Sequence, residues 1–569
     1  MRHLSILLFS VIHLGAALPT SRYQSVDHRS GPTVSIQNGT LVGTTNIHYQ
    51  QDFFLGIPYA APPVKQLRLR RPSPASSWAS ARHATSYSAR CIGNSINLAG
   101  FSQNTTDPMS EDCLYLNVVR PSGILAADKV PVLIWIHGGA LLEGSASDGR
   151  SNGTFLVEIS VRMGTPVIFV SFNYRLGAFG ILAGREVEAA GLANLALHDQ
   201  RQALVWIQEN IAHFGGDTSR VTIMGESAGA GSVGFHLLAY GGRNDGLFSA
   251  AIAQSGGPQS TLMTIRTASE RESDFEIVLQ EAGCENSRHS LDCLRKVPAE
   301  VMRQAGQRLP TSIAVDGDMV RHSGTQLRQG HFVRVPLLIG TTRNEGTSFV
   351  QQTTAQGPIN TEEDFIRVVE GSLGNKAVPK KAIRRWAELY QLEVDAPSGG
   401  GLGTVLPNPG ANYGSQYGKT TLWMGDVMFT AGRRRSSQAW ANHQVPSYSY
   451  LFDTVPAIAD PQTLGAAHFL EMPNVFGNTE GVGWTRDPFP SDPVQRQKHY
   501  TLADIVSQMW ISFTVTGSSN FHQVPDFNIT WPIYQEDDPQ NMVFSASLGS
   551  HLQPDTWRAE AFDMLSQYF

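Results

Sequence analysis

One serine of this chain stands in a pattern that suits a nucleophile. Residues 220–232 begin as an apolar β-strand, turn abruptly at Gly-Glu-Ser-Ala-Gly (225–229) and continue as a helix of small residues. A serine at the centre of such a strand–turn–helix, here Ser227, has a strained backbone that lifts its hydroxyl clear of the sheet. Because the chain holds 54 glycines, chance alone can produce this pattern, so Ser227 needs a base, an acid and hydrogen-bond donors elsewhere.

Two residues further along the chain are candidates for the acid and the base that acyl transfer by serine requires. Glu345 follows the buried strand predicted over 335–339, on a polar turn. A carboxylate in such a turn is often merely solvated, but its position between the serine and the candidate base favours a catalytic acid. Five of the 17 histidines come after it: His443, His468, His499, His522 and His551. Only His468 lies in a loop of small residues after an apolar strand (447–452), so His468 is the predicted base.

Backbone N–H groups suited to an oxyanion follow an earlier strand. The predicted strand 130–136 runs directly into His-Gly-Gly-Ala (137–140). The N–H groups of Gly139 and Ala140, with that of Ala228 beside the nucleophile, would surround the oxygen of a tetrahedral intermediate. A glycine pair after a strand is often only a turn, but its coincidence with the serine pattern favours an oxyanion hole. Losing one such donor costs roughly 2.7–4 kcal/mol of transition-state stabilisation.

The elements that must position these groups alternate between buried strands and helices. Five short apolar runs are typical of strands buried on both faces: 130–136, 167–172, 221–224, 250–253 and 335–339. Such runs between helices predict an α/β fold with a mostly parallel central sheet. Residues 192–214 carry apolar side chains at helical spacing and end before a glycine pair, which predicts one of the helices. Residues 355–440 are predicted to form a helical insertion within a single domain spanning 18–569.

Composition and the N-terminus indicate an exported globular protein. The 569 residues are 41% hydrophobic and 16% charged, with a net charge of −6, which is typical of a folded domain. The densest basic cluster, 433–435, predicts a solvated helix face, so we expect no nucleic-acid partner. A basic start, an apolar stretch and small residues at its end are typical of a signal peptide over 1–17, which predicts secretion. This stretch is too short to span a membrane and no similar one follows, so we expect no stable membrane anchor.

The four cysteines and four glycosylation sequons agree with export. Four thiols allow three pairings, of which Cys91–Cys113 with Cys284–Cys293 is the simplest because both loops close at low entropic cost. No Cys-x-x-Cys or histidine-rich spacing accompanies them, so we expect neither a metal site nor a cofactor. The candidate glycosylation sites are Asn38, Asn104, Asn152 and Asn528.

Further motifs are informative because of their order along the chain. They are Glu-Asp-Cys-Leu-Tyr-Leu-Asn-Val at 111–118, Ser-Phe-Asn-Tyr-Arg-Leu-Gly at 171–177, Asn-Leu-Ala-Leu-His-Asp-Gln at 194–200, Phe-Gly-Gly-Asp at 214–217, Asn-Glu-Gly at 344–346, residues 510–520, and Trp-Pro-Ile-Tyr at 531–534. With the serine pattern, they resemble the type-B carboxylesterase/lipase family, the cholinesterase-like branch of the α/β-hydrolases. The resemblance covers nearly the whole mature chain. It implies an α/β-hydrolase fold, with a mostly parallel central sheet flanked by helices and with helical insertions.

The resemblance also carries site residues onto this chain. It implies Ser227 as nucleophile, Glu345 as acid and His468 as base. It further implies the two local disulfides proposed above and an oxyanion hole built from Gly139, Ala140 and Ala228. Many relatives have a third glycine where this chain has alanine, but an alanine still supplies the N–H. Glu226 and Glu471 match family positions to which we assign supporting electrostatic roles at most.

The predicted function is that of a secreted serine hydrolase that cleaves carboxylic esters through an acyl-enzyme. An interfacial triacylglycerol lipase of the same family is the alternative. The loop between Cys91 and Cys113 favours the esterase, because its 21 residues are few and polar for a lid. The loop also lacks a tryptophan for cation–π contact with choline esters. A non-enzymatic, adhesion-type relative is disfavoured because the three catalytic residue types are all in place.

Overall fold

All the buried strands predicted from the sequence lie in one large central sheet. The computed structural model describes residues 31–102, 107–261, 263–351, 357–373, 378–390, 406 and 409–568, so the predicted signal peptide and Asn104 lie outside the described residues. Within them, the central sheet has eleven strands in the spatial order β18 (His551–Pro554), β17 (Gln540–Phe544), β16 (Ser447–Phe452), β15 (Leu337–Thr342), β12 (Ala250–Gln254), β11 (Gly216–Glu226), β9 (Val130–Ile136), β10 (Ile168–Phe172), β8 (Tyr115–Pro121), β4 (Gln51–Pro58) and β3 (Thr44–Asn46).

The middle of this sheet is parallel and its two edges are antiparallel. Every strand from β10 to β17 runs parallel to its neighbours in that stretch. At one edge β8, β4 and β3 pair antiparallel, and at the other β18 pairs antiparallel with β17. All side chains of β9 and β15 are buried, as expected for parallel strands covered on both faces. The mostly parallel sheet predicted from the sequence is confirmed.

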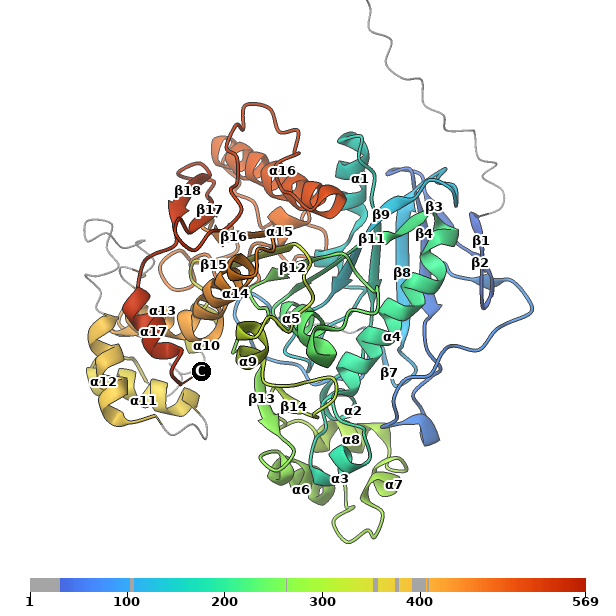
Figure 1. Cartoon of the computed structure of the whole chain (residues 1–569), viewed down its shortest axis with the longest axis horizontal. Helices are drawn as coiled ribbons and strands as arrows, with labels where there is room; N and C mark the ends of the chain where they lie inside the picture. Colours follow the sequence, from blue (N-terminus) through green and yellow to red (C-terminus); the bar gives the residue numbers. More distant parts are fainter. Residues whose placement is uncertain are drawn as a thin grey trace, which may run out of the picture.

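Alternate side chains of each strand enter two separate cores. In β9, Val132 and Ile134 pack into the first core, whereas Leu133 and Trp135 pack into the second. The first core is covered by α4 (Leu195–Asn210), α5 (Ala228–Gly242), α9 (Ser323–Arg328) and α14 (Ala431–Asn442). The second is covered by α1 (Thr154–Arg162), α15 (Met472–Val475) and α16 (Pro493–Thr516). Figure 1 shows α1 and α16 together on one side of the sheet and α4 and α5 on the other.

Two further groups of helices have hydrophobic clusters of their own. One contains α10 (Thr347–Val350), α11 (Glu362–Leu373), α12 (Lys380–Leu389), α13 (Tyr417–Gly425), a π-helical turn (Asp426–Thr430) and α17 (Ala559–Leu565). The other contains α2 (Gly177–Gly180), α3 (Arg185–Ala189), α6 (Glu272–Glu281), α7 (Ser290–Leu294), α8 (Ala299–Ala305) and a side chain of β14 (Ser312–Val315), a strand that pairs in parallel with β13 (Thr264–Thr267). The helical character predicted for 355–440 is therefore confirmed in the described part of this range, and the C-terminal α17 packs against α12.

Both predicted cysteine pairs form disulfides. Cys91–Cys113 closes a loop whose two ends pair as β6 (Arg90–Cys91) and β7 (Met109–Ser110). Cys284–Cys293 joins the segment after α6 to α7. A third small sheet, β1 (Thr33–Ile36), β2 (Gly39–Val42) and β5 (Arg82–His83), lies near the start of the described chain. None of the helices described is both long and apolar enough to cross a lipid bilayer.

The prediction of a solvated basic face at 433–435 is wrong. The side chains of Arg433 and Arg434 are almost fully buried and converge on one carboxylate, that of Asp555. Arg434 donates to Oδ1 at 2.8 Å, and Arg433 binds both carboxylate oxygens. Burial opposes the charge of Asp555, but the two guanidinium groups lower the pKa of this carboxyl to about 2. The helix can bury these arginines because Asp555, more than a hundred residues later in the chain, supplies the carboxylate that neutralises them.

Candidate active site

The turn around Ser227 has the strained geometry that its sequence predicts. Ser227 alone connects β11 to α5, with φ 56° and ψ −124°. Its N–H donates to the carbonyl of Gln254 in β12 at 2.9 Å. A Cβ at Gly229 would lie 2.0 Å from the carbonyl oxygen of Ile136, and a Cβ at Gly225 would lie 2.4 Å from the backbone of Gly229. Since backbone cannot move aside cheaply, both glycines are required for the turn.

Ser227, His468 and Glu345 form a continuous hydrogen-bonded chain. Nε2 of His468 lies 2.8 Å from Oγ of Ser227, and Nδ1 lies 2.7 Å from Oε2 of Glu345. The three side chains are 5%, 0% and 1% exposed in the order serine, histidine, glutamate. They follow β11, β16 and β15, whose carboxyl ends lie at one edge of the parallel sheet. The structure therefore brings together all three residues that the sequence singled out.

Glu345 is held in place by two donors that the sequence did not reveal. Its Oε1 accepts the N–H of Thr342 at 2.8 Å and the hydroxyl of Ser255 at 2.6 Å. Its other oxygen, Oε2, accepts from His468. With Nδ1 donating to the carboxylate, Nε2 of a neutral imidazole is left as the acceptor facing Ser227. Glu345 thus sets both the orientation and the tautomer of His468.

The loop that follows β9 lies directly against Ser227. A Cβ at Gly138 would fall 3.1 Å from Cβ of Ser227. Gly139 and Ala140 both have left-handed backbones, with φ 96° and 57°. Their carbonyl oxygens accept bonds from within the protein: that of Ala140 from the Thr311 hydroxyl at 3.1 Å, that of Gly139 from two N–H groups later in the loop. Their own N–H groups have no acceptor in the described part of the chain, as donors reserved for an oxyanion would require.

Two further carboxyl groups, those of Glu226 and Glu471, are fully buried near His468. Oε1 of Glu226 lies 3.3 Å from Nε2 of His468, yet neither carboxyl oxygen makes a hydrogen bond with the residues described. Burial, with the charges of Glu471 and Glu345, raises the pKa of Glu226 well above its usual range. Burial raises the pKa of Glu471 to about 8, and this carboxyl accepts from the Gln254 amide at 3.3 Å. A protonated Glu226 leaves Glu345 as the charged partner of His468.

Two aromatic rings pack against the imidazole of His468. The ring of Phe429 lies 4.7 Å from that of His468, and the ring of Phe349 lies 5.2 Å from it. Phe429 comes from the π-helical turn before α14, and Phe349 from α10. π-Helical turns are frequent at functional sites, but no sequence pattern marks this one. These rings pack against His468, which is fully buried.

The predicted glycosylation residues differ in their surroundings. Asn528 is exposed, whereas Asn38 and Asn152 are half-buried. The amide of Asn38 donates to the carbonyl of Ala75 at 2.8 Å, and that of Asn152 accepts the N–H of Thr154 at 3.1 Å. Asn528 is therefore the described sequon with the most accessible side chain.

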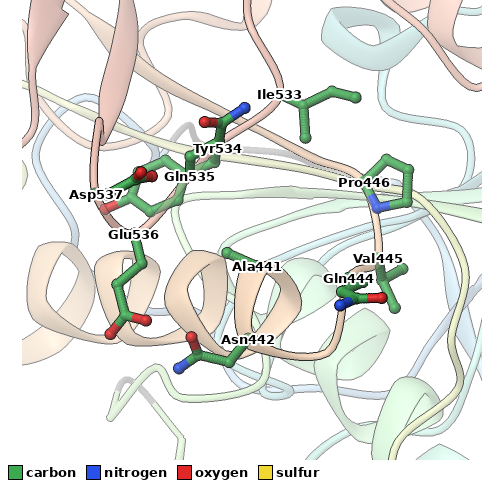
Figure 2. Close-up of a pocket in the computed structure, with 10 residues that line it drawn as sticks. All are labelled: Ala441, Asn442, Gln444, Val445, Pro446, Ile533, Tyr534, Gln535, Glu536 and Asp537. Carbon is green, nitrogen blue, oxygen red and sulfur yellow. The ribbon is translucent and has the colours of Figure 1, made fainter.

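A surface cavity of about 680 Å³ lies elsewhere, at the end of α14 (Figure 2). Its lining residues come from the end of that helix and from the segment 533–537: Ala441, Asn442, Gln444, Val445, Pro446, Ile533, Tyr534, Gln535, Glu536 and Asp537. None belongs to the hydrogen-bonded chain of Ser227, and the hydroxyl of Tyr534 is already bonded to Asp555 at 2.9 Å. This cavity is separate from the candidate active site.

Comparison with known proteins identifies the family of this chain. The sequence profile described as “Carboxylesterase family” matches residues 30–557. Lipase 1 of Geotrichum candidum is 38% identical over 356 residues, or 55% of this chain, and the match spans only 62% of that relative's length. Secreted lipase 1 of Botryotinia fuckeliana (strain B05.10) is 31% identical over 609 aligned positions, covering 98% of this chain and 97% of that protein. The crystal structure of Aspergillus niger EstA superposes with a TM-score of 0.80 at 27% identity, covering 95% of this chain and 98% of that one. The chain therefore belongs to the carboxylesterase family and has the α/β-hydrolase fold.

Proposed function

We propose that this protein is a serine hydrolase that cleaves carboxylic esters, with Ser227 as nucleophile, His468 as base and Glu345 as acid. The observation that carries the proposal is the pair of hydrogen bonds that runs from the serine to the glutamate, 2.8 Å and 2.7 Å long. This order of groups, with the serine on a strained turn, is what nucleophilic acyl transfer requires.

The reaction follows from the positions of these atoms. Nε2 of His468 removes the proton of Ser227 as Oγ attacks the ester carbonyl carbon. The resulting imidazolium is stabilised by Glu345 through Nδ1, and it then gives its proton to the departing alcohol. Water enters, loses a proton to the same nitrogen and attacks the acyl-enzyme. The acid leaves, and the proton returns to Ser227.

The negative charge of each tetrahedral intermediate needs donors already in place. We assign this role to the N–H groups of Gly139 and Ala140, which have no acceptor in the described part of the chain, and to that of Ala228. Ala228 is the first residue of α5, and an N–H in the first turn of a helix has no partner within the helix. The helix N-terminus also favours negative charge beside Ser227.

For the substrate we propose esters that are dissolved in water. The loop between Cys91 and Cys113 buries its larger apolar side chains, Leu98 and Phe101, in the core, and of its described residues only Met109 is a large exposed apolar one. A lid that binds a lipid surface needs the opposite arrangement. An interfacial lipase is the second candidate, since the two relatives above are named lipases.

We also propose that the protein is secreted and that its signal peptide is residues 1–17. The two disulfides, Cys91–Cys113 and Cys284–Cys293, are typical of proteins that fold in an oxidising compartment. The relative from Botryotinia fuckeliana is named a secreted lipase. N-terminal sequencing of the protein recovered from the culture medium tests this: the mature chain is expected to start at or shortly after residue 18.

The chemistry is tested with Ser227→Ala on a panel of esters of varied acyl length, together with labelling by a fluorophosphonate. We expect Ser227→Ala to lose label and to lose roughly 10⁴-fold or more of kcat. Ser219→Ala is the matched control, because Ser219 is an exposed serine on the same strand and its removal leaves the site intact. If Ser227→Ala keeps its activity, the proposed function is wrong.

The choice between esterase and lipase is tested by the rate on a short-chain ester below and above its solubility limit. An esterase reaches its full rate below the limit. A rate that rises only once the ester forms a separate phase would identify an interfacial lipase and overturn the preference for soluble esters.

A further inference from the structure

Arg150 is a buried cation that the reaction above does not use. It lies in the 3-10 turn Gly149–Ser151, shortly after the oxyanion loop, and its side chain is 6% exposed. Its guanidinium binds both carboxylate oxygens of Asp148, at distances from 2.7 to 3.1 Å. Its Nη1 donates to the carbonyl oxygen of Phe101 at 2.5 Å. These bonds fix a buried charge between two segments that lie 49 residues apart in the chain.

Three aromatic rings surround the same guanidinium, and together with Arg150 they form what we call the Arg150 cluster. Its Cζ lies 5.2 Å from the ring centre of Phe101, 4.6 Å from that of Phe469 and 5.6 Å from that of Trp484. The ring centres of Phe101 and Phe469 are 4.9 Å apart, edge to face. Cation–π attraction is strongest where the cation has lost its water, as it has here.

This cluster reaches the base because Phe469 is the residue next to His468. Phe469 has φ 74°, a backbone conformation that a bulky side chain rarely adopts unless its surroundings hold it. Phe469 is 4% exposed, and its ring contacts the rings of Phe101 and Trp484 as well as the guanidinium of Arg150. If the backbone of Phe469 relaxed to a negative φ, the main chain next to His468 would rotate and move the imidazole.

The disulfide loop is joined to the base through the same cluster. Phe101 belongs to the loop closed by Cys91–Cys113, and both its ring and its carbonyl oxygen contact Arg150. A Cβ at the neighbouring Gly100 would lie 3.4 Å from the carbonyl oxygen of His468, so this loop lies against the backbone of the base.

We propose that Arg150 is a positioning residue: it clamps Phe101 to Phe469 and so holds His468 within hydrogen-bonding distance of Ser227. The inference rests on the proposed function, since it concerns the base of that reaction. The hydrogen bonds of Arg150 go to Asp148 and to the carbonyl oxygen of Phe101. Its contact with the segment of the base is therefore the one with the ring of Phe469. The same clamp keeps the disulfide loop closed onto the base, which suits a substrate that reaches the site from solution.

The test uses two variants of the full-length protein. Arg150→Met removes the charge and the hydrogen bonds but keeps the length of the aliphatic chain, and Arg150→Lys restores the charge. Active sites are counted by fluorophosphonate labelling to completion, and kcat and KM for a soluble short-chain ester are expressed per labelled site. A catalytic group displaced by about 1 Å costs up to about 100-fold in rate. We therefore expect Arg150→Met to lose about 10- to 100-fold in kcat with KM nearly unchanged, and Arg150→Lys to recover part of the loss.

Arg120→Met is the matched control for a buried arginine. Arg120 on β8 likewise contacts a carboxylate (Asp52, 3.3 Å), a main-chain carbonyl (Phe214, 2.9 Å) and a ring (Phe54, 5.3 Å). It lies at the antiparallel side of the sheet, away from the base. We expect this variant to lower stability while kcat per labelled site stays that of the wild type. An equal loss of kcat in both methionine variants would overturn the inference.

Phe469→Leu tests the path from Arg150 to the base. Phe469→Leu is also combined with Arg150→Met in a double variant. If Arg150 acts through this ring, the fold loss of kcat in the double variant is smaller than the product of the fold losses in the two single variants. Fully multiplicative losses would refute that path. A wild-type protein that neither hydrolyses esters nor takes the label would overturn the proposed function, whereas an unchanged kcat per site in Arg150→Met would overturn this inference alone.

Discussion

Replacing Glu471 by glutamine is expected to stabilise the protein at alkaline pH and to change little near pH 5. Burial, together with the charge of Glu345, raises the pKa of the Glu471 carboxyl from 4.5 to about 8. Glutamine has the shape of the protonated acid and keeps an oxygen for the amide of Gln254, which lies 3.3 Å from the carboxyl. The substitution therefore removes a group that ionises in the fold only at a cost.

The sign and size follow from linkage between proton binding and folding. Between pH 4.5 and 8, the folded protein keeps a proton on Glu471 that the unfolded chain has released, so the stability of the wild type falls as the pH rises through this window. At about 1.36 kcal/mol per pH unit, the window is worth at most about 5 kcal/mol. The glutamine variant has no such loss. Its advantage is expected to grow from under about 1 kcal/mol near pH 5 towards about 4 kcal/mol near pH 8.

The measurement is denaturant unfolding of the wild type and Glu471→Gln at pH 5 and pH 8.5, compared as midpoints with equal m-values. Glu276→Gln serves as the control, because Glu276 is an exposed glutamate on α6 and its removal is expected to change the midpoint equally little at both pH values. If the difference between the wild type and Glu471→Gln is the same at both pH values, Glu471 is not protonated in the fold and the reasoning fails.

Three further substitutions test the geometry of the site. Ser255→Ala deletes the 2.6 Å hydrogen bond to Glu345 and is expected to cost about 1.5–3 kcal/mol of stability and to lower kcat/KM. Denaturant unfolding and steady-state kinetics measure the two effects, and unchanged values would contradict the role of this donor. Ala140→Gly removes the steric strain of a left-handed alanine, so the free energy of unfolding is expected to rise by about 1–2 kcal/mol while kcat/KM is retained. A loss of stability in the same unfolding assay would refute the argument from strain. Gly229→Ala places a Cβ 2.0 Å from the Ile136 carbonyl oxygen and is expected to yield almost no folded protein, judged by circular dichroism and recovered yield; a well-folded variant would refute the steric argument.

The sequence alone singled out the three candidate catalytic residues and the strands that carry them. The reason is that both depend on local chemistry. The turn at Ser227 requires Gly225 and Gly229 because backbone lies within 2.4 Å of where their Cβ atoms would be. A run such as 130–136 has no polar side to offer to water, so it is buried on both faces wherever the chain folds. Chain order then paired Glu345 and His468 with the serine.

The surroundings of these groups were decided only by the tertiary structure. Ser255, Phe429 and Arg150 stand in no pattern that separates them from other serines, phenylalanines and arginines, because each acts on a partner distant in the chain. Arg433 shows the same limit: a basic run on a helix predicts exposure, yet Asp555, 122 residues later, supplies the anion that allows burial. A sequence pattern reflects the preferences of residues that are close together in the chain. Which distant group a residue meets depends on close packing in three dimensions, which a single sequence does not contain.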